Sequence, residues 1–243
     1  MNNTITLEKM KKLRFFGMYN YFNNALETGI IHDFKANEFV AHLIEAEYEN
    51  RHDIKLQGLI KSANFRFIAQ VEDIKYNADR NLTKNQILKI CDLKWLNNGG
   101  NIIITGFTGT GKTFLSCAIG LKACMNGFRV GYYNSNKFFY QLKYAKSCGN
   151  YLKELEKIIK KDLIIIDDFG LEILDKESRM SLFEILEERT EKKSMIISSQ
   201  LSIENWYDII GEKTIADTIC DRIISNSQYI NLQGDSMRKI KKS

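Results

Sequence analysis

The sequence of 243 residues contains no proline. Its turns must therefore depend on Gly, Asn, Asp and Ser, which form tight turns by other means. It also lacks any apolar run approaching the ~20 residues that a membrane-spanning helix needs. The first residues, MNNTITLEKMKKLRFF, carry charges where a signal peptide has its apolar segment. These absences predict a cytoplasmic protein that has no contact with a membrane.

Cysteine and histidine are also sparse, and neither is arranged for metal binding. The five cysteines are odd in number and include no C-x-x-C pair, which argues against a disulfide framework or a zinc site. His32, His42 and His52 have no cysteine nearby. Apolar residues make up 44% of the chain and charged residues 27%, a balance typical of a folded globular protein. A reducing compartment is therefore expected.

The net charge of +5 is spread unevenly along the chain. Between Lys137 and Lys161, seven lysines are accompanied by only two acidic residues, Glu154 and Glu156. Such a stretch can attract a polyanion such as nucleic acid. The alternative is an ordinary solvated surface, and charge alone favours this alternative.

The first part of the chain is predicted to be helical. Apolar residues recur there at helical spacing. They include Met18, Tyr21, Phe22, Ala25 and Leu26, and then Val40, Leu43, Ile44 and Tyr48. Residues 63–85 are mixed and polar, so the domain junction is placed among them. This divides the chain into a helical N-terminal domain, residues 1–75, and a second domain, residues 76–243.

The second domain alternates strands with helices. Strands are expected at 101–105, 129–134, 163–166 and 195–198, and helices at 112–126 and 177–192. Thr214 and Asp217 form a capping-box pattern before a further helix that carries Ile219 and Ile223. Continuous apolar strands in repeated β-α units predict a parallel sheet that is covered on both faces.

A glycine-rich segment joins the first of these strands to its helix. It reads Gly106-Phe107-Thr108-Gly109-Thr110-Gly111-Lys112-Thr113 and matches the P-loop pattern G-x-x-x-x-G-K-[ST]. The glycines let successive backbone N–H groups turn inward, and the helix N-terminus adds to this cradle for phosphates. Lys112 is expected near the β- and γ-phosphates of ATP, and Thr113 is expected to offer its hydroxyl to Mg²⁺.

The apolar strand at residues 163–166 ends in two carboxylates, Asp167 and Asp168. A strand of this kind is what a Walker B element needs. Asp167 is predicted to hold Mg²⁺, directly or through water. Asp168 is then available to orient or deprotonate the attacking water. Many ATPases have Glu at this position, so the shorter Asp must approach more closely or act through an additional water.

Two further positions fit an ATPase that works as a multimer. Ser199 and Gln200 follow the strand at 195–198, where a polar side chain can reach the γ-phosphate or the attacking water; a plain strand exit is the alternative. Arg222 lies on the last predicted helix and is a candidate arginine finger, a residue type worth ~10³–10⁵ in rate in GTPases. An intramolecular pair of Arg222 with Asp221 or Asp217 is the alternative.

In this order, GFTGTGKT, LIIIDDFG, IISSQ and WYDIIGEKTIADTICDRII resemble the IstB-like transposition helper ATPases. NLQGDSMRK at the end and RNLTKNQILKI before the P-loop add to the resemblance, which covers residues 76–240. The family belongs to the AAA+ superfamily, close to DnaC-type helicase loaders and DnaA-type initiators. The resemblance implies an α/β fold: a three-layer P-loop sandwich around a parallel sheet, preceded by a small all-helical domain.

The resemblance also implies partners and roles. Such helpers bind ATP, assemble on double-stranded DNA as homo-oligomers and work with a cognate transposase. An extra helix near residues 136–147 would face DNA, which makes Lys137, Lys143 and Lys146 candidate phosphate contacts. The resemblance favours Arg222 as the finger and the pair Ser199 and Gln200 as a sensor, although many relatives have Asn there. Arg238 is either a second sensor or part of a basic tail.

Three functions are consistent with these features. The first is an ATP-controlled, DNA-binding transposition helper. The second is a replicative helicase loader, whose N-terminal domain would grip a helicase instead of DNA; the balanced charge of residues 1–75 supports it. The third is a small-molecule kinase, which the P-loop alone permits but for which the sequence offers neither an acceptor pocket nor a lid.

Overall fold

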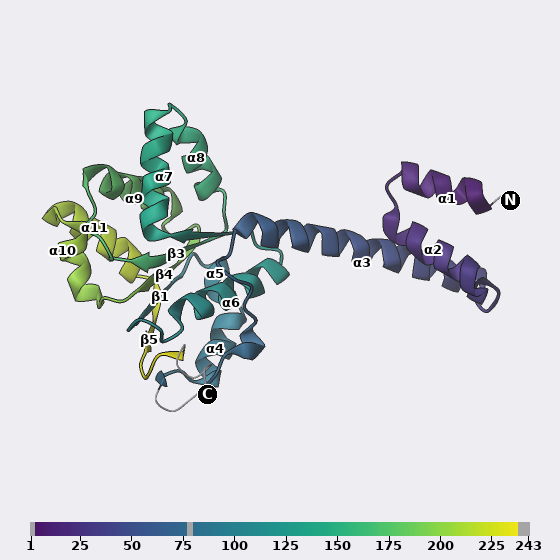
Figure 1. The fold of residues 1–243 in the computed structure, drawn as a ribbon, viewed down its shortest axis with the longest axis horizontal. Helices are drawn as coiled ribbons and strands as arrows, with labels where there is room; N and C mark the ends of the chain where they lie inside the picture. Colours follow the sequence, from purple (N-terminus) through teal and green to yellow (C-terminus); the bar gives the residue numbers. More distant parts are fainter. Residues whose placement is uncertain (1–2, 77–79, 238–243) are drawn as a thin grey trace. The chain divides into compact units, whose positions relative to one another are not determined.

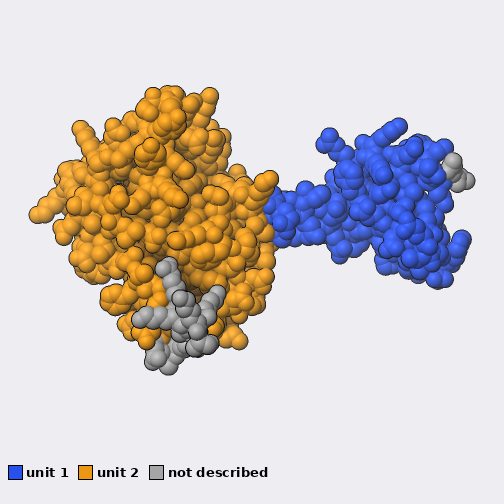
Figure 2. Space-filling view, in the orientation of Figure 1, with its two compact units in different colours: residues 1–58 blue, residues 59–243 orange. Residues whose placement is uncertain are grey.

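The computed structural model describes residues 3–76 and 80–237, and the chain divides into two compact units (Figures 1 and 2). The first unit comprises residues 1–58 and the second comprises residues 59–243. The division lies earlier than the junction expected after residue 75. Residues 59–75 belong to the second unit because they pack against its central helix, as described below. No helix in the described ranges is both long and apolar enough to cross a bilayer.

The first unit is helical, as predicted. It contains α1 (Asn3–Lys12), α2 (Phe16–Thr28), the 3-10 turn η1 (Ile30–His32) and most of α3 (Ala36–Ala63). Helices α2 and α3 approach so closely at Gly17 that a Cβ atom there would lie 2.2 Å from the carbonyl oxygen of Ala46. The buried Glu47 accepts the Gly17 N–H at 2.8 Å, which satisfies a donor of the first turn of α2.

The second unit is built on a parallel sheet of five strands in the order β2-β3-β4-β1-β5. The strands are β1 (Asn101–Gly106), β2 (Val130–Asn134), β3 (Leu163–Phe169), β4 (Ser194–Ser199) and β5 (Ser227–Leu232). The four predicted strands are confirmed, and β5 is additional. Its side chains alternate with only Ile230 and Leu232 buried, so it lacks the continuous apolar run that marks the other four.

Helices cover both faces of this sheet (Figure 1). One face carries α6 (Lys112–Met125), against which Ile165 of β3 packs at Gly120. The other face carries α7 (Ser135–Ser147), α9 (Lys176–Arg189) and α11 (Lys213–Ile224), with α8 (Tyr151–Ile159) beside α7 and α9. Their apolar side chains form a core with alternate strand residues, including Ile103, Ile164 and Ile197. The predicted parallel sheet with two covered faces is confirmed.

Shorter elements complete the second unit. They are η2 (Val71–Asp73), α4 (Lys84–Cys91), α5 (Lys94–Asn97), η4 (Ile203–Asn205) and α10 (Trp206–Ile210). A capping box formed by Thr83 and Gln86 starts α4. The capping box expected at Thr214 is wrong. Helix α11 begins at Lys213 after Glu212, which makes no side-chain cap, so Thr214 lies inside the first turn.

One buried arginine connects the ends of a helix and two strands. Arg189, at the end of α9, is 1% exposed, and burial lowers its pKa to about 10. Its guanidinium donates to the backbone carbonyls of Ile158, Ile159, Lys161, Asp162 and Ser194. These carbonyls mark the end of α8, the approach to β3 and the start of β4. Arg189 therefore sets how α9 meets the two central strands.

Replacing Arg189 with Ala should lower the free energy of unfolding by about 3–5 kcal/mol, because several buried carbonyls lose their only side-chain donor. Urea unfolding followed by circular dichroism measures this loss. Lys192→Ala, an exposed lysine on the following turn, is the control and should change stability by less than about 0.5 kcal/mol. Equal stability of the two variants would contradict the role assigned to Arg189.

Candidate functional site

The glycine-rich loop joins β1 to α6, as predicted. Gly111 precedes the first turn of α6 in the left-handed conformation (φ 94°), which glycine adopts without strain. At Gly106, a Cβ atom would lie 2.3 Å from the carbonyl oxygen of Leu232 on β5, so no larger residue fits. The loop therefore brings the N–H groups at the start of α6 to the carboxyl end of the sheet, where an anion can be bound.

Lys112 is buried at the centre of the loop. Its ammonium donates to the carbonyls of Gly106 at 2.7 Å and Phe107 at 3.1 Å. Thr110 is also buried, and its hydroxyl donates to the same Phe107 carbonyl at 2.8 Å. The Phe107 side chain itself is 78% exposed. Lys112 and Thr110 thus fix the loop from inside, and Lys112 places a positive charge within the cradle.

Two further segments, whose contacts with the loop the sequence analysis did not predict, also support it. Arg80 is buried and donates to the carbonyl of Thr110 at 2.8 Å; burial lowers its pKa. On the other side, the backbone N–H of Met237 donates to the carbonyl of Gly109 at 2.9 Å. Arg80 opens the RNLTKNQ stretch, so its place in that motif was the only available signal. The loop is therefore held by residues from both ends of the second unit.

Asp167 lies at the carboxyl end of β3 and is fully buried. Three hydroxyl groups donate to its carboxylate. Thr113 donates to Oδ2 at 2.8 Å, Tyr132 donates to the same oxygen at 2.6 Å, and Ser198 donates to Oδ1. Burial and the bond to Asp167 raise the pKa of Tyr132, which keeps its hydroxyl protonated and donating. The pairing of Thr113 with Asp167 was predicted, whereas Tyr132 and Ser198 were not.

The oxygens of Thr113 and Asp167 could hold a magnesium ion. Mg²⁺ prefers hard oxygen ligands and usually takes one or two protein side chains together with substrate phosphates and waters. A hydroxyl and a carboxylate that lie 2.8 Å apart beside a phosphate cradle match this preference. No cluster of three or more His, Cys, Asp or Glu side chains suited to a metal occurs within residues 3–76 and 80–237. The donor set fits a metal shared with a nucleotide.

Asp168 follows in a strained conformation. Its φ of 60° is left-handed, which is uncommon for a residue other than glycine and concentrates at functional sites. Its backbone N–H donates to Ser198 Oγ at 3.2 Å, and Asn134 donates to its Oδ2 at 3.2 Å. Arg66 lies 3.6 Å from the same oxygen. The carboxylate is thus turned out of the strand and placed beside Asp167.

The two residues predicted to follow β4 are placed differently. Ser199 is fully buried, and its hydroxyl donates to the carbonyl of Phe169 and accepts from the indole of Trp206. The structure does not bring Ser199 to Asp167 or the loop; the serine beside Asp167 is Ser198. Gln200 does reach the loop, because Thr108 donates to its Oε1 at 2.7 Å. A period-2 strand points neighbouring residues to opposite sides, which separates Ser198 from Ser199.

Arg222 lies on α11, away from the loop of its own chain. It pairs with Glu187 of α9, and its guanidinium lies 5.0 Å from the centre of the Phe183 ring. The expected alternative partners were Asp217 and Asp221, but the pair is made across helices instead. The Arg222 side chain remains 25% exposed. Its Nη1 is buried without a hydrogen-bond partner among the described residues, so Arg222 must leave Glu187 before it can contact a neighbouring molecule.

The three lysines proposed to contact DNA lie on α7. Lys137 is exposed and lines a cleft that also includes Arg66 and Asp168. Lys143 pairs with Asp175, the N-cap of α9. Lys146 Nζ lies 5.3 Å from the centre of the Tyr151 ring. Two of the three lysines thus have partners within the chain. Arg238 lies outside the described residues.

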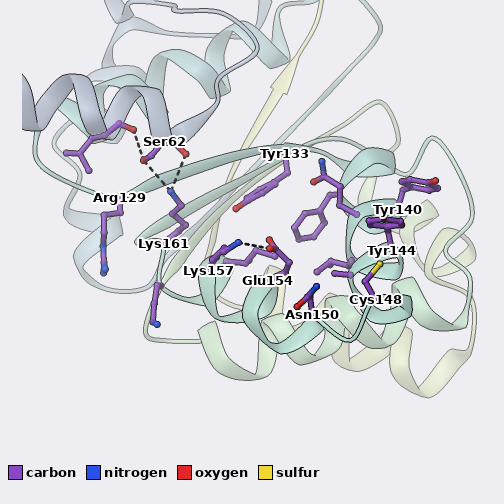
Figure 3. A pocket seen from close by; sticks show the side chains of 17 residues that line it. Ser62, Arg129, Tyr133, Tyr140, Tyr144, Cys148, Asn150, Glu154, Lys157 and Lys161 are labelled. Carbon is purple, nitrogen blue, oxygen red and sulfur yellow. Dashed lines mark hydrogen bonds and ion pairs between the residues drawn. The ribbon is translucent and has the colours of Figure 1, made fainter.

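Three other lysines of the stretch, Lys157, Lys160 and Lys161, line a second hollow, drawn in Figure 3. This groove of about 990 Å³ runs beside α7 and α8 and is lined by Tyr140 and Tyr144. Lys157 at its edge pairs with Glu154 at 2.6 Å, and Lys161 donates to the carbonyl of Ser62 at 3.3 Å. Lysines of the stretch therefore line two separate hollows, and the positive charge in this one is partly offset by Glu154.

Solved structures similar to this one include replication proteins. The crystal structure of a DnaC helicase loader superposes with a TM-score of 0.58 at 18% identity, over 70% of this chain and 98% of the other. AMPPCP-bound DnaA from Aquifex aeolicus gives a TM-score of 0.59 at 20% identity, over 73% of this chain and 56% of DnaA. At such identities the likeness shows the fold, and it confirms the predicted AAA+ fold class.

Sequence comparison identifies the family. The family described as IstB-like ATP binding protein matches residues 8–243. An insertion sequence ATP-binding protein of Sinorhizobium fredii is 35% identical over 234 residues, which are 96% of each chain. The corresponding protein of IS21 from Pseudomonas aeruginosa is 24% identical over 94% of this chain and 86% of its own length. The chain therefore belongs to the family of IstB-like ATP binding proteins.

Proposed function

We propose that this protein is an ATP-dependent DNA-binding transposition helper that hydrolyses ATP. The observation that carries the proposal is the contact of Thr113 with Asp167 at the mouth of a P-loop, in a chain of the IstB-like family. The insertion-sequence context of its relatives supports a role with a cognate transposase. The similarity to DnaC-type loaders is one of fold, so helicase loading is not favoured.

Each residue of the site has a proposed task. The N–H groups from Gly109 to Thr113 bind the phosphates, and Lys112 neutralises charge on them. Thr113 and Asp167 would hold Mg²⁺, which would offset the negative charge of the phosphates. Asp168 orients the attacking water and accepts its proton. Gln200, held by Thr108, would sense the γ-phosphate.

ATP hydrolysis is proposed to control assembly on double-stranded DNA. Arg222 would leave its pair with Glu187 to enter the site of a neighbouring copy, where it would stabilise transition-state charge. Shared sites of this kind make the homo-oligomer depend on bound ATP. Lys137, Lys143 and Lys146 are proposed to contact DNA phosphates. Binding through phosphates would be largely independent of sequence and sensitive to salt. The reducing cytoplasm suits the free cysteines.

Replacing Lys112 with Ala should abolish nucleotide binding, because the cradle loses its buried positive charge. Titration with a fluorescent ATP analogue should show a loss of affinity of at least about a hundredfold, the equivalent of a charge-assisted hydrogen bond or two. Lys122→Ala, at the far end of α6, is the control and should bind normally. Binding that survives in Lys112→Ala would contradict the site.

Replacing Arg222 with Ala should leave nucleotide binding intact but reduce turnover by about 10³-fold. Glu187→Ala is the matched control, because it breaks the same ion pair and keeps the arginine. Turnover should persist in Glu187→Ala if Arg222 acts on a neighbouring site. Normal hydrolysis by the Arg222 variant, or equal loss in both variants, would show that the residue is structural.

The assembly proposal is tested by measuring ATPase rate and sedimentation together, with and without duplex DNA. The expected result is growth in particle size that requires both ATP and DNA, and an ATPase rate that changes with it. Raising the salt concentration should reverse the assembly as counterions compete for the phosphates. A monomer that ignores DNA with every nucleotide would refute the proposal.

A further inference from the structure

A short segment between α3 and η2 delivers an arginine to the candidate ATPase site. Phe65 and Phe67 flank Arg66 and fix it against α6. The Phe65 ring lies so close to Gly120 that a Cβ atom there would be 2.7 Å from the ring. The Phe67 and Phe114 rings are 6.3 Å apart, and the backbone of Phe67 hydrogen-bonds Cys117. Arg66 is therefore anchored on both sides by aromatic residues that pack on the P-loop helix.

The end of α3 is fixed as well. Ala63 is buried, and Lys161, just before β3, donates to both the carbonyl and the hydroxyl of Ser62 (Figure 3). Asn64 then turns the chain with a left-handed φ of 55°, which Asn tolerates better than most residues. The position of the Arg66 backbone is thus determined by the second unit itself.

The guanidinium of Arg66 faces the two aspartates at the end of β3. Its Nη1 lies 3.6 Å from Asp168 Oδ2 and 4.0 Å from Asp167 Oδ2. Asn134 donates to the same oxygen of Asp168. Two donor groups therefore share the oxygen with which Asp168 would receive a proton from water. An oxygen held by both groups is less free to turn toward a water than one that is released.

The same arginine opposes the metal. Asp167 Oδ2 also accepts from Thr113, and these are the oxygens assigned to Mg²⁺. A guanidinium 4.0 Å from that carboxylate oxygen would repel a divalent cation bound to it. Arg66 contacts the carboxylates of Asp167 and Asp168, and both of these contacts act against hydrolysis.

We propose that Arg66 is a positioning residue that restrains Asp168 and thereby holds ATP turnover below the rate the site can reach. The inference rests on the proposed function, because it assigns Asp168 as the base. Lys137 lines the same cleft as Arg66 and Asp168, so an anion bound there, such as a DNA phosphate, would draw the arginine away. Arg66 is 49% exposed and can make that movement.

The size of the effect on kcat follows from the exposure of the Arg66 side chain. Half-exposed ion pairs contribute up to about 1 kcal/mol, so releasing Asp168 should raise kcat by about two- to fivefold. The KM for ATP should stay within about twofold, because the phosphate cradle is unchanged. The Mg²⁺ concentration needed for half-maximal binding of AMPPCP should fall by a similar two- to fivefold, because a nearby positive charge is removed.

The experiment compares full-length Arg66→Ala and Arg66→Lys with the wild type. Steady-state ATPase assays give kcat and KM, and Mg²⁺ titrations with AMPPCP give a readout that does not depend on turnover. Arg129→Ala is the matched control. Arg129 is 52% exposed and pairs with Asp162 just before β3, at the other end of the strand from Arg66. Thermal melts check that each variant is folded.

Arg66→Ala should show the raised kcat and the lowered Mg²⁺ requirement, Arg66→Lys should lie closer to the wild type, and Arg129→Ala should match it. Saturating duplex DNA should stimulate the wild type more than Arg66→Ala. A lower kcat in Arg66→Ala would make Arg66 a catalytic residue, and an unchanged kcat would show that it has no role; both overturn the inference. Absence of turnover in every protein would instead refute the proposed ATPase function.

Discussion

The structure of the site depends on hydrogen bonds to one carboxylate inside the protein. Asp167 is fully buried, and a buried polar group that lacks hydrogen bonds destabilises the fold, so the fold must supply donors to it. It does so from three elements: Tyr132 of β2, Ser198 of β4 and Thr113 of α6. The strand order places β3 between β2 and β4, and the P-loop helix lies over the same strand end. The carboxyl edge of the sheet is therefore organised around Asp167.

The neighbouring Asp168 is controlled from farther away. Its left-handed backbone turns the side chain out of the strand, where Asn134 and Arg66 meet it. Asn134 ends β2, whereas Arg66 follows α3, so the two donors come from separate segments of the second unit. Under the proposed roles, this arginine would couple the base to a segment outside the glycine-rich loop. Regulation of the proposed ATPase would then enter through the residues around Arg66.

Local motifs were readable from the sequence, and contacts between distant segments were not. The four apolar strands, the glycine-rich loop between β1 and α6, and the place of Asp167 at the end of β3 each depend on a short stretch, so their positions were predicted correctly. Tyr132, Ser198 and Arg80 are brought to the site by the order of the strands in the sheet and by the path of the chain between them. No local sequence pattern encodes either of these. Ser199 was expected at the position that Ser198 occupies. The sequence alone does not show which residues of a strand point to which side of the sheet. The division between the two compact units, after Gly58, lies before the mixed and polar residues 63–85 in which the junction was expected.

The most direct measurement is a crystal structure of the protein with ATP and magnesium. The account predicts phosphates bound by the backbone N–H groups of the loop from Gly109 to Thr113. It also predicts a metal ion between the Thr113 hydroxyl and the Asp167 carboxylate. A nucleotide bound elsewhere, or a loop that stays closed by its own side chains at saturating ATP, would contradict it.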